Sequence, residues 1–216
     1  MIYTRCMTND CLVFVRNKSI ESLCLCASVF ILNQCRLSLP RNILQLFNTT
    51  IMTRIGLISD THSYFDPRFL ELFKDVDEIW HAGDIGSREV LDAMSSFKPV
   101  RAVYGNIDDA SLRRELPEHQ RFMCEGVDVW ITHIGGYPGK YAPGIRPVMQ
   151  VKAPKLFVCG HSHILKVMND STYHLLHVNP GSAGLSGFHA VRTALRFVID
   201  GDNIRNMEVI ELGSRR

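Results

Sequence analysis

Five short apolar segments of this chain are each followed directly by side chains that can bind a metal ion. They span residues 54–58, 78–81, 100–104, 127–132 and 156–159, and each has the composition of a buried strand. The motifs that follow them are Ser59-Asp60-Thr61-His62, Gly83-Asp84, Gly105-Asn106, Thr132-His133 and Gly160-His161-Ser162-His163. Strand–helix–strand units place the carboxyl ends of their strands on one edge of a sheet. The fold is therefore expected to bring these distant side chains together.

Two helices are expected between the first strands. Asp66-Pro67 favours the start of one, with a capping Asp and a Pro at the first helical position. In this first helix the apolar residues on one face would be Phe69, Leu70 and Phe73. Ser87 is expected to cap the second helix, in which Val90, Leu91 and Met94 repeat the helical spacing.

The last quarter of the chain changes character. Residues 164–168, 174–179, 192–199 and 204–212 are predicted to be successive strands. Asn169-Asp170-Ser171 and Asp200-Gly201 have the composition of hairpin turns. We therefore expect a second, mostly antiparallel sheet packed on the first.

The polar side chains at the strand ends are suited to two metal ions. A mixture of carboxylate, imidazole and amide ligands fits Mn, Fe, Zn, Ni or Co better than Ca or Mg, which prefer oxygen alone. A bridging carboxylate lets two cations sit roughly 3.5–4 Å apart and hold one phosphoryl group. Asp84 is the natural bridge, because it stands alone on its loop. The metal ligands we expect are Asp60, His62, Asp84, Asn106, His133, His161 and His163.

These motifs, in this order, resemble those of the calcineurin-like metallophosphoesterases. The similarity extends from Arg54 to about Leu212 and is greatest to their small single-domain bacterial and archaeal phosphodiesterases. It implies an α/β fold, a two-sheet β-sandwich flanked by helices in four layers. It also implies that one metal is bound by Asp60, His62, Asp84 and His163, and the other by Asp84, Asn106, His133 and His161.

The resemblance implies hydrolysis of phosphoric esters, most of all diesters. A hydroxide that bridges two divalent ions, with Mn expected, would attack phosphorus, and the catalytic residues would be Asp60, His62, Asp84 and Asn106. Many members of the family carry a His directly after the Asn, where this chain has Ile107. Ile cannot transfer a proton, so alkyl monoesters are expected to react worst. The neighbouring Asp108 could replace this His in part, although a turn or supporting role is the expected one.

Other residues have several interpretations. We expect a core or supporting role for His81, and structural roles for His119, His174, His177 and His189. Loop 135–144 is either a lid whose Tyr and Lys contact substrate or a long surface turn. Residues 179–182 are expected to shape a turn near the site. Arg146 and Arg192 are either phosphate contacts or ordinary solvated or ion-paired residues.

The first 51 residues differ from the rest. They hold five of the seven cysteines and an apolar stretch, Leu23–Leu32, that is too short to span a bilayer and poorly matches a signal peptide. We expect Met52 to be the true start, residues 1–51 to be a non-native or disordered extension, and residues 52–216 to be the metallophosphoesterase domain. Cys124 and Cys159 are expected to be buried thiols in a cytoplasmic protein.

Composition limits the partners. A net charge of +2 is too mild for a nucleic-acid or membrane surface, so the expected partner is a small phosphate ester, with a homo-oligomer left open. The rival function is a scaffold of the same fold that binds a protein partner with little activity, as in the retromer coat. A scaffold is expected to lose His62, which is present here. Recombination-repair nucleases of this fold have additional domains and a longer chain, which argues against them.

Overall fold

The alternation of side chains along the first strand sets the layers of the fold. In the computed structural model, which describes residues 52–215, β1 spans Met52–Ile58. Ile55 and Leu57 are buried in the core between two sheets, whereas Ile58 belongs to a second core beneath the helices. Because successive strand residues point to opposite faces, one strand contributes to both cores.

The first sheet has the strand order β12-β11-β1-β2-β3. Two of its strands, β2 (Glu78–His81) and β3 (Val100–Ala102), extend it in parallel from β1. On the other side of β1, the long hairpin of β11 (Val191–Asp200) and β12 (Asn203–Ser214) adds antiparallel strands. The carboxyl ends of β1, β2 and β3 therefore meet at one edge.

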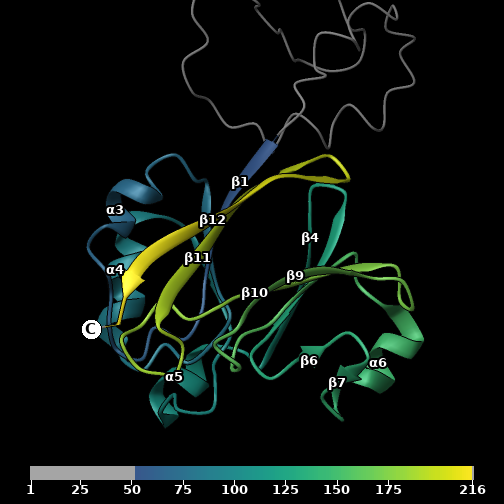
Figure 1. The fold of residues 1–216 in the computed structure, drawn as a ribbon, viewed down its shortest axis with the longest axis horizontal. Helices are drawn as coiled ribbons and strands as arrows, with labels where there is room; N and C mark the ends of the chain where they lie inside the picture. Colours follow the sequence, from purple (N-terminus) through teal and green to yellow (C-terminus); the bar gives the residue numbers. More distant parts are fainter. Residues whose placement is uncertain (1–51, 216) are drawn as a thin grey trace, which may run out of the picture. The chain divides into compact units, whose positions relative to one another are not determined.

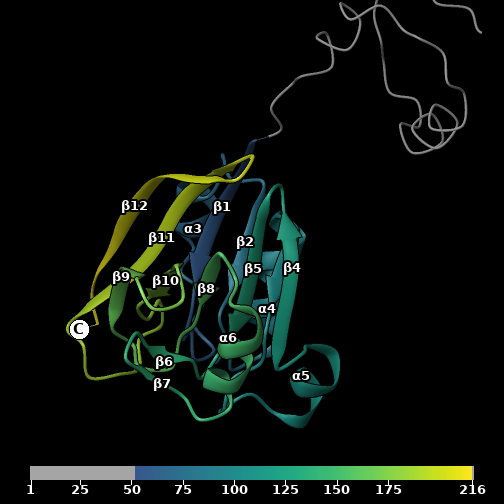
Figure 2. The ribbon, with the colours of Figure 1, turned by 90° about the vertical axis from the view of Figure 1, so that its right-hand side faces the viewer.

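The second sheet has the order β4-β5-β8-β10-β9 and is also mixed. Its parallel centre consists of β5 (Val127–Thr132), β8 (Leu156–Val158) and β10 (Leu175–Pro180). The antiparallel strands β4 (His119–Cys124) and β9 (Leu165–Asp170) form its two edges. Figure 2 shows the two sheets face to face, with β12 and β9 on one side and β4 on the other.

Helices cover both outer faces of this sandwich (Figure 1). The first sheet is covered by α3 (Phe69–Leu72) and α4 (Arg88–Phe97), whose buried residues join Ile58 and Ile79 in one core. The second sheet is covered by α6 (Ile145–Lys152), which packs on Trp130 and Phe157. Near the carboxyl ends of the parallel strands lie α5 (Ala110–Glu115) and the hairpin of β6 (Gly136–Tyr137) and β7 (Lys140–Tyr141).

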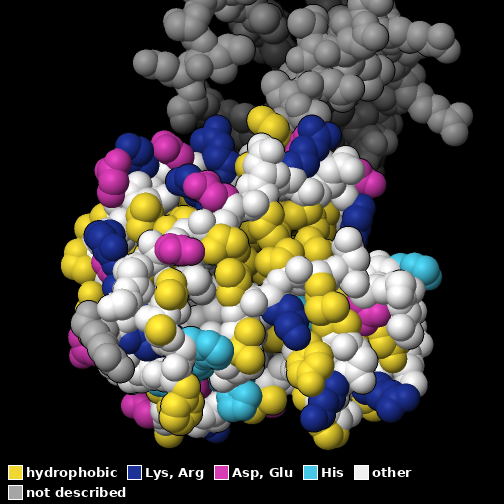
Figure 3. Space-filling model, in the orientation of Figure 1, with side chains coloured by type: hydrophobic (Ala, Val, Ile, Leu, Met, Phe, Trp, Pro, Cys, Tyr) yellow, Lys and Arg dark blue, Asp and Glu magenta, His cyan; other side chains and the backbone are white. Residues whose placement is uncertain are grey.

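The core between the sheets is apolar and centred on Trp80. This fully buried indole meets the rings of Phe122 and Phe197 edge-on, at centroid distances of 5.2 and 5.7 Å. Such edge-to-face contacts add to the free energy gained from burial. Figure 3 shows hydrophobic side chains gathered between β11–β12 and β9–β10.

The expected two-sheet sandwich with flanking helices is confirmed. Helix α4 starts after Ser87 as expected, but the side chain of Ser87 makes no capping hydrogen bond. The prediction that the last four strands form a separate antiparallel sheet was wrong. Instead β11 pairs with β1, and β10 pairs with β8. The alternation of residues along a strand identifies which side chains share a face of the sheet, but it does not say which sheet edge a hairpin joins.

The first helix also differs from the expectation. Asp66 does cap the turn, since its Oδ1 accepts the backbone N–H of Arg68 at 3.1 Å, but α3 is only four residues long. In so short a helix Leu70 lies outside the buried face and is 49% exposed, unlike Phe69 and Phe73.

Three further predictions concern the N-terminal extension, membrane-spanning helices and the cysteines. The proposed extension, residues 1–51, lies outside the described part of the chain. Within residues 52–215 no helix is both long and apolar enough to cross a membrane. Cys124 and Cys159 are buried free thiols, as expected.

Gly56 provides a test of the packing between β1 and α3. A Cβ there would lie 2.9 Å from the ring of Phe73, which is fully buried. We expect Gly56→Ala to destabilise the full chain by about 1–3 kcal/mol through overpacking, measured by urea unfolding. Phe73→Leu in the same chain should recover part of this loss. Strictly additive effects of the two substitutions would contradict the contact, and Gly144→Ala, where a Cβ meets nothing within 4 Å, is the control.

Candidate metal centre

The loops that carry the expected ligands continue the hydrogen bonding of the strands. Backbone N–H groups of Asp60 and His62 donate to the carbonyls of Gly83 and Asp84, at 3.0 and 3.1 Å. In the second sheet, the N–H of Gly160 donates to the carbonyl of His133 at 3.0 Å. The first two contacts fix the β1 loop against the β2 loop, and the third fixes the β8 loop against the end of β5.

Five of the seven expected ligands have a left-handed backbone. Positive φ angles of this kind are uncommon for residues other than Gly, and they concentrate at functional sites. The φ angles lie between 48° and 66° for Asp60, His62, Asp84, His161 and His163. Each of these residues turns the chain sharply just beyond a strand, which directs its side chain back over the sheet edge.

Six of the seven side chains form two groups. The first group is Asp60, His62 and His163, and the second is Asp84, His133 and His161, with the ligand atoms in each group within 4.8 Å of one another. The two ligand sets implied by the family resemblance divide these residues in the same way, but they also place Asp84 in both sets and Asn106 in the second.

Asp84 lies between the two groups. Its Oδ1 is 3.2 Å from Nε2 of His133, and its Oδ2 is 3.8 Å from Nε2 of His62. The carboxylate thus presents one oxygen to each group, and the backbone N–H of Ile107 donates to Oδ1 at 3.0 Å. This is the geometry that a bridging carboxylate requires.

Asn106 joins the second group through its amide oxygen. This oxygen lies 3.0 Å from Nε2 of His133 and 2.8 Å from Nδ1 of His161. The other ring nitrogen of His133, Nδ1, is 2.8 Å from the carbonyl of Ala82. Because a carbonyl only accepts, Nδ1 carries the hydrogen and Nε2 is left facing two oxygens. A ring held in this way is oriented as metal-binding histidines are.

Asp60 is fully buried, and one of its oxygens faces the first group. Its Oδ2 accepts from the hydroxyl of Ser59 at 2.5 Å and from the N–H of His161 at 3.2 Å. Oδ1 has no hydrogen-bond partner among the described residues, although Nε2 of His163 lies 3.1 Å away. That nitrogen is also 3.2 Å from Nε2 of His62. Two ring nitrogens and a buried carboxylate oxygen therefore point at one small volume.

The electrostatics of the site favour charge on Asp84. Burial opposes its ionisation, but the contacts with His133 and the N–H of Ile107 outweigh burial, so its pKa lies below the usual value. The same carboxylate raises the pKa of His133 in spite of burial. For His62 burial dominates and lowers the pKa.

Residues beneath the site hold the ligand loops in place. His81 is buried as expected, and burial lowers its pKa to about 4. Its Nδ1 accepts the N–H of Gly83 at 3.1 Å, so Nε2 donates to the hydroxyl of Thr61 at 2.9 Å. The supporting role expected for Asp108 is confirmed, because its two oxygens accept the N–H groups of Gly86 and Gly105, at 2.6 and 2.7 Å.

The segment 179–182 supports the site from the other side, as expected. Asn179 donates to the carbonyl of Gly160 at 2.8 Å, and the hydroxyl of Ser182 donates to the carbonyl of Asp60 at 3.0 Å. Arg192 does not reach the ligands. It is buried and ion-paired with Asp66 at 3.0 Å, which accords with the ordinary interpretation. Arg146 is exposed on α6.

Loop 135–144 forms the β6–β7 hairpin and is anchored to the second sheet. The hydroxyl of Tyr141 donates to Asp170 at 2.7 Å, and Nε2 of His177 donates to the carbonyl of Gly136 at 3.0 Å. Because of these contacts, the loop is neither a mobile lid nor a simple surface turn, the two alternatives expected for it. Ala142 and Gly144 instead form part of the wall of a cavity.

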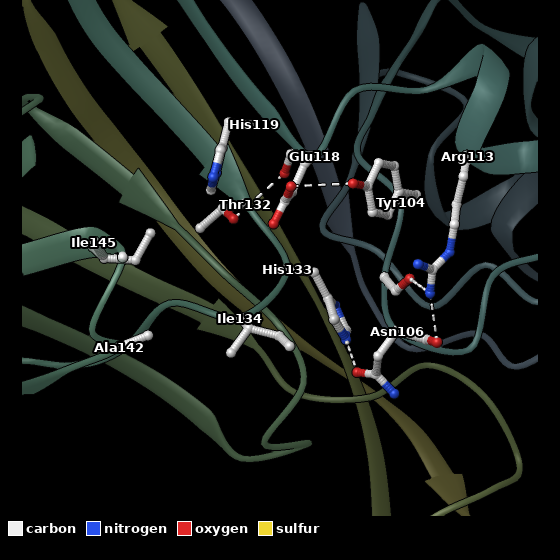
Figure 4. Close-up of a pocket in the computed structure, with 12 residues that line it drawn as sticks. Tyr104, Asn106, Arg113, Glu118, His119, Thr132, His133, Ile134, Ala142 and Ile145 are labelled. Atoms are coloured by element: carbon white, nitrogen blue, oxygen red, sulfur yellow. Dashed lines mark hydrogen bonds between the residues drawn. The ribbon is translucent and has the colours of Figure 1, made fainter.

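That cavity, of about 510 Å³, adjoins Asn106 and His133 (Figure 4). Its lining includes Tyr104, Arg113, Glu118 and His119, none of which was expected at the site. The sequence shows no evident partner for His119, so a structural role is expected for it. The signal that places His119 opposite Thr132 is the alternating segment His119–Cys124, which the two-residue turn Glu125-Gly126 joins to β5.

Comparisons with known proteins show the family of the chain. The sequence profile of the calcineurin-like phosphoesterase superfamily domain matches residues 53–202. A "Probable metallophosphoesterase" of Methanothermobacter thermautotrophicus is 28% identical over 167 residues, which are 74% of this chain and 93% of that protein. Another, from Methanocaldococcus jannaschii, is 34% identical over 138 residues, 59% of this chain and 67% of that protein.

Solved structures share the fold. An archaeal phosphodiesterase superposes with a TM-score of 0.57 at 21% identity, over 73% of this chain and all of that one. Vps29 of Entamoeba histolytica, solved in complex with Zn²⁺, gives a TM-score of 0.56 at 16% identity, over 74% and 99% of the two chains.

Gly105 tests the position of the Asp84 carboxylate. A Cβ at residue 105 would lie 2.1 Å from Oδ1 of Asp84 and 2.3 Å from its backbone nitrogen. We expect Gly105→Ala to displace Asp84 and weaken the binding of Mn²⁺ by about 10-fold or more, measured by isothermal titration calorimetry. Gly144→Ala, with open space around its Cβ, should bind as the native chain does. Unchanged affinity in a folded Gly105→Ala protein would show that Asp84 does not hold the metal.

Proposed function

The chain belongs to the calcineurin-like phosphoesterase superfamily, and from this premise we propose that it is a phosphodiesterase that works with two divalent cations. The position of Asp84 carries the proposal. One carboxylate oxygen faces each group of ligands, so a single side chain can join two cations. Paired cations of this kind act on phosphoric esters by holding the attacking and leaving oxygens.

The side chains fit such cations. The unpartnered Oδ1 of Asp60 is a buried acceptor, and a buried carboxylate oxygen without a partner is costly. His62 and His163 direct ring nitrogens at the same volume. A cation there would satisfy all three atoms. Asp60, His62, His163 and Asp84 would hold one ion, and Asp84, Asn106, His133 and His161 the other.

The kinds of ligand narrow the choice of metal. Both groups combine imidazole nitrogens with carboxylate or amide oxygens and contain no thiolate. This set favours Mn²⁺, with Fe, Zn, Ni or Co as alternatives, over Ca²⁺ and Mg²⁺. When bound, two such cations lower the pKa of a water molecule and offset the negative charge that grows on the phosphoryl oxygens.

The chain's own residues would orient the reacting groups. Asp84 is held by the N–H of Ile107, and His133 by the carbonyl of Ala82, so neither side chain is free to rotate. Ligands fixed before the substrate arrives need little reorganisation during the reaction.

Proton supply favours diesters over alkyl monoesters. The side chain of Ile107 is 44% exposed beside the site but has no proton to give. Asp108 is no substitute, because both its oxygens accept backbone N–H groups. Because neither Ile107 nor Asp108 can protonate an alkoxide, esters with better leaving groups should react best.

Hydrolysis of two nitrophenyl esters tests the proposal. The full chain, stripped of metal and titrated with Mn²⁺, should hydrolyse bis(p-nitrophenyl) phosphate with a kcat/KM about 10-fold or more above that for p-nitrophenyl phosphate if it is a phosphodiesterase. Both esters release p-nitrophenolate, so this ratio measures the preference for diesters and not the supply of a proton. Asp84→Asn should lower kcat/KM for the diester by about 100-fold or more. Asp92→Asn, an exposed carboxylate on α4, is the matched control.

Two results would contradict the proposal. Hydrolysis that survives in Asp84→Asn after metal binding is lost would exclude the two-cation mechanism. A folded chain that is inactive with every divalent metal tested would favour the scaffold function. The structural similarity to Vps29 shows the fold alone and does not distinguish a scaffold from an enzyme.

A further inference from the structure

The cavity beside Asn106 and His133 is open space next to the proposed reaction centre. Its volume of about 510 Å³ lies in the range of small-molecule sites in proteins. The loop after β3 and α5 form one side, the starts of β4 and α6 form others, and the end of β5 crosses between them. A substrate whose phosphorus lies between the two ligand groups would have one substituent beside this cavity.

One wall of the cavity is apolar. Figure 4 shows Ile134, Ala142 and Ile145 on one side, across from Tyr104 and Arg113. Ile134 follows the ligand His133 directly, yet it is 47% exposed. An isoleucine exposed at the mouth of a polar site gains free energy if an apolar surface of a ligand covers it.

The opposite wall is polar, but its groups are largely paired. The guanidinium of Arg113 donates to the carbonyls of Gly105, Asn106 and Asp108, at 3.2, 2.7 and 2.7 Å. It also lies over the ring of Tyr104, 5.2 Å from the centroid. Arg113 therefore shapes this wall and is poorly placed to bind a second phosphate.

Glu118 adds a carboxylate to the same wall as the Arg113 guanidinium. Its carboxylate accepts from the hydroxyl of Tyr104 at 3.1 Å, which leaves further acceptor positions for a hydroxyl group of a ligand. With Arg113 engaged by carbonyls, neither the carboxylate nor the apolar wall would stabilise a developing anion. Since the leaving oxygen gains negative charge during hydrolysis, this cavity suits the substituent that remains bound to phosphorus.

From these features we propose that the cavity binds the retained, uncharged organic substituent of a phosphodiester, a group of nucleoside size with an apolar face and hydroxyl groups. The inference rests on the proposed phosphodiesterase function. The apolar face would lie on Ile134, Ala142 and Ile145, and a hydroxyl would donate to Glu118. Ala142, the small residue of the apolar wall, sets how large that substituent can be.

Two esters with the same leaving group test the proposal. Thymidine 5′-(p-nitrophenyl) phosphate and methyl p-nitrophenyl phosphate both release p-nitrophenolate and differ only in the retained substituent. In the full chain with Mn²⁺, kcat/KM for the thymidine ester should exceed that for the methyl ester by about 10-fold or more. Thymidine alone should inhibit hydrolysis of the methyl ester competitively.

Filling the cavity should remove the preference. Ala142→Trp is expected to lower the ratio of kcat/KM for the thymidine ester to kcat/KM for the methyl ester by about 10-fold. Ile134→Ala, a milder change in the same wall, should weaken the thymidine ester alone. Val151→Trp is the matched control, because Val151 is 89% exposed on α6 and does not line the cavity.

The outcomes separate the two proposals. No hydrolysis of either ester would overturn the phosphodiesterase function itself. Hydrolysis of both esters with equal kcat/KM, together with no inhibition by thymidine, would overturn the cavity assignment alone. If Ala142→Trp and Ile134→Ala slow both esters equally, the cavity holds the leaving group and the proposal is wrong.

Discussion

The carboxylates of Asp60 and Asp84 are buried side by side with imidazoles at one edge of the sandwich, and the surrounding loops are arranged around their charge. Both residues are at most 2% exposed. Removing such charges from water costs several kcal/mol unless partners compensate them. His133 compensates Asp84 in part, but Oδ1 of Asp60 has no hydrogen bond within the described residues. Under the proposed function, two cations complete the compensation, so folding of the loops and metal binding are linked.

The same loops store backbone strain. Left-handed conformations at non-glycine residues cost roughly 1–3 kcal/mol each and persist only where surrounding contacts enforce them. Here the contacts are the backbone hydrogen bonds between neighbouring loops and the buried side chains of His81, Asp108 and Asn179. The contacts of these loops with the sandwich offset the cost of the left-handed conformations and hold the candidate ligands in place. The adjoining cavity has one apolar and one polar wall. This difference between its walls is the basis for proposing a substituent with an apolar face and hydroxyl groups.

The sequence indicates the candidate ligands because each lies within a few residues of the end of a strand. Glycines at 83, 105 and 160 mark places where no side chain fits, and the structure shows a Cβ there within 2.6 Å of another ligand or of Ser59. The pairing of strands is harder to predict from the sequence, because the periodicity of β11 alone is compatible with either sheet. The cavity is hard to predict for a similar reason, because Arg113 lies in α5 whereas the adjacent Glu118 and His119 lie at the start of β4. The hairpin of β4 and β5 places His119 opposite Thr132, but no spacing in the sequence links Arg113 to that pair.

The most direct test of the account is to locate the metals. Crystals of the full chain grown with Mn²⁺ should show two anomalous diffraction peaks at the manganese edge, one on each side of the Asp84 carboxylate and roughly 3.5–4 Å apart. Each peak should be surrounded by one of the two ligand groups. A single peak, or peaks that do not contact Asp84, would contradict the two-cation centre and with it the proposed mechanism.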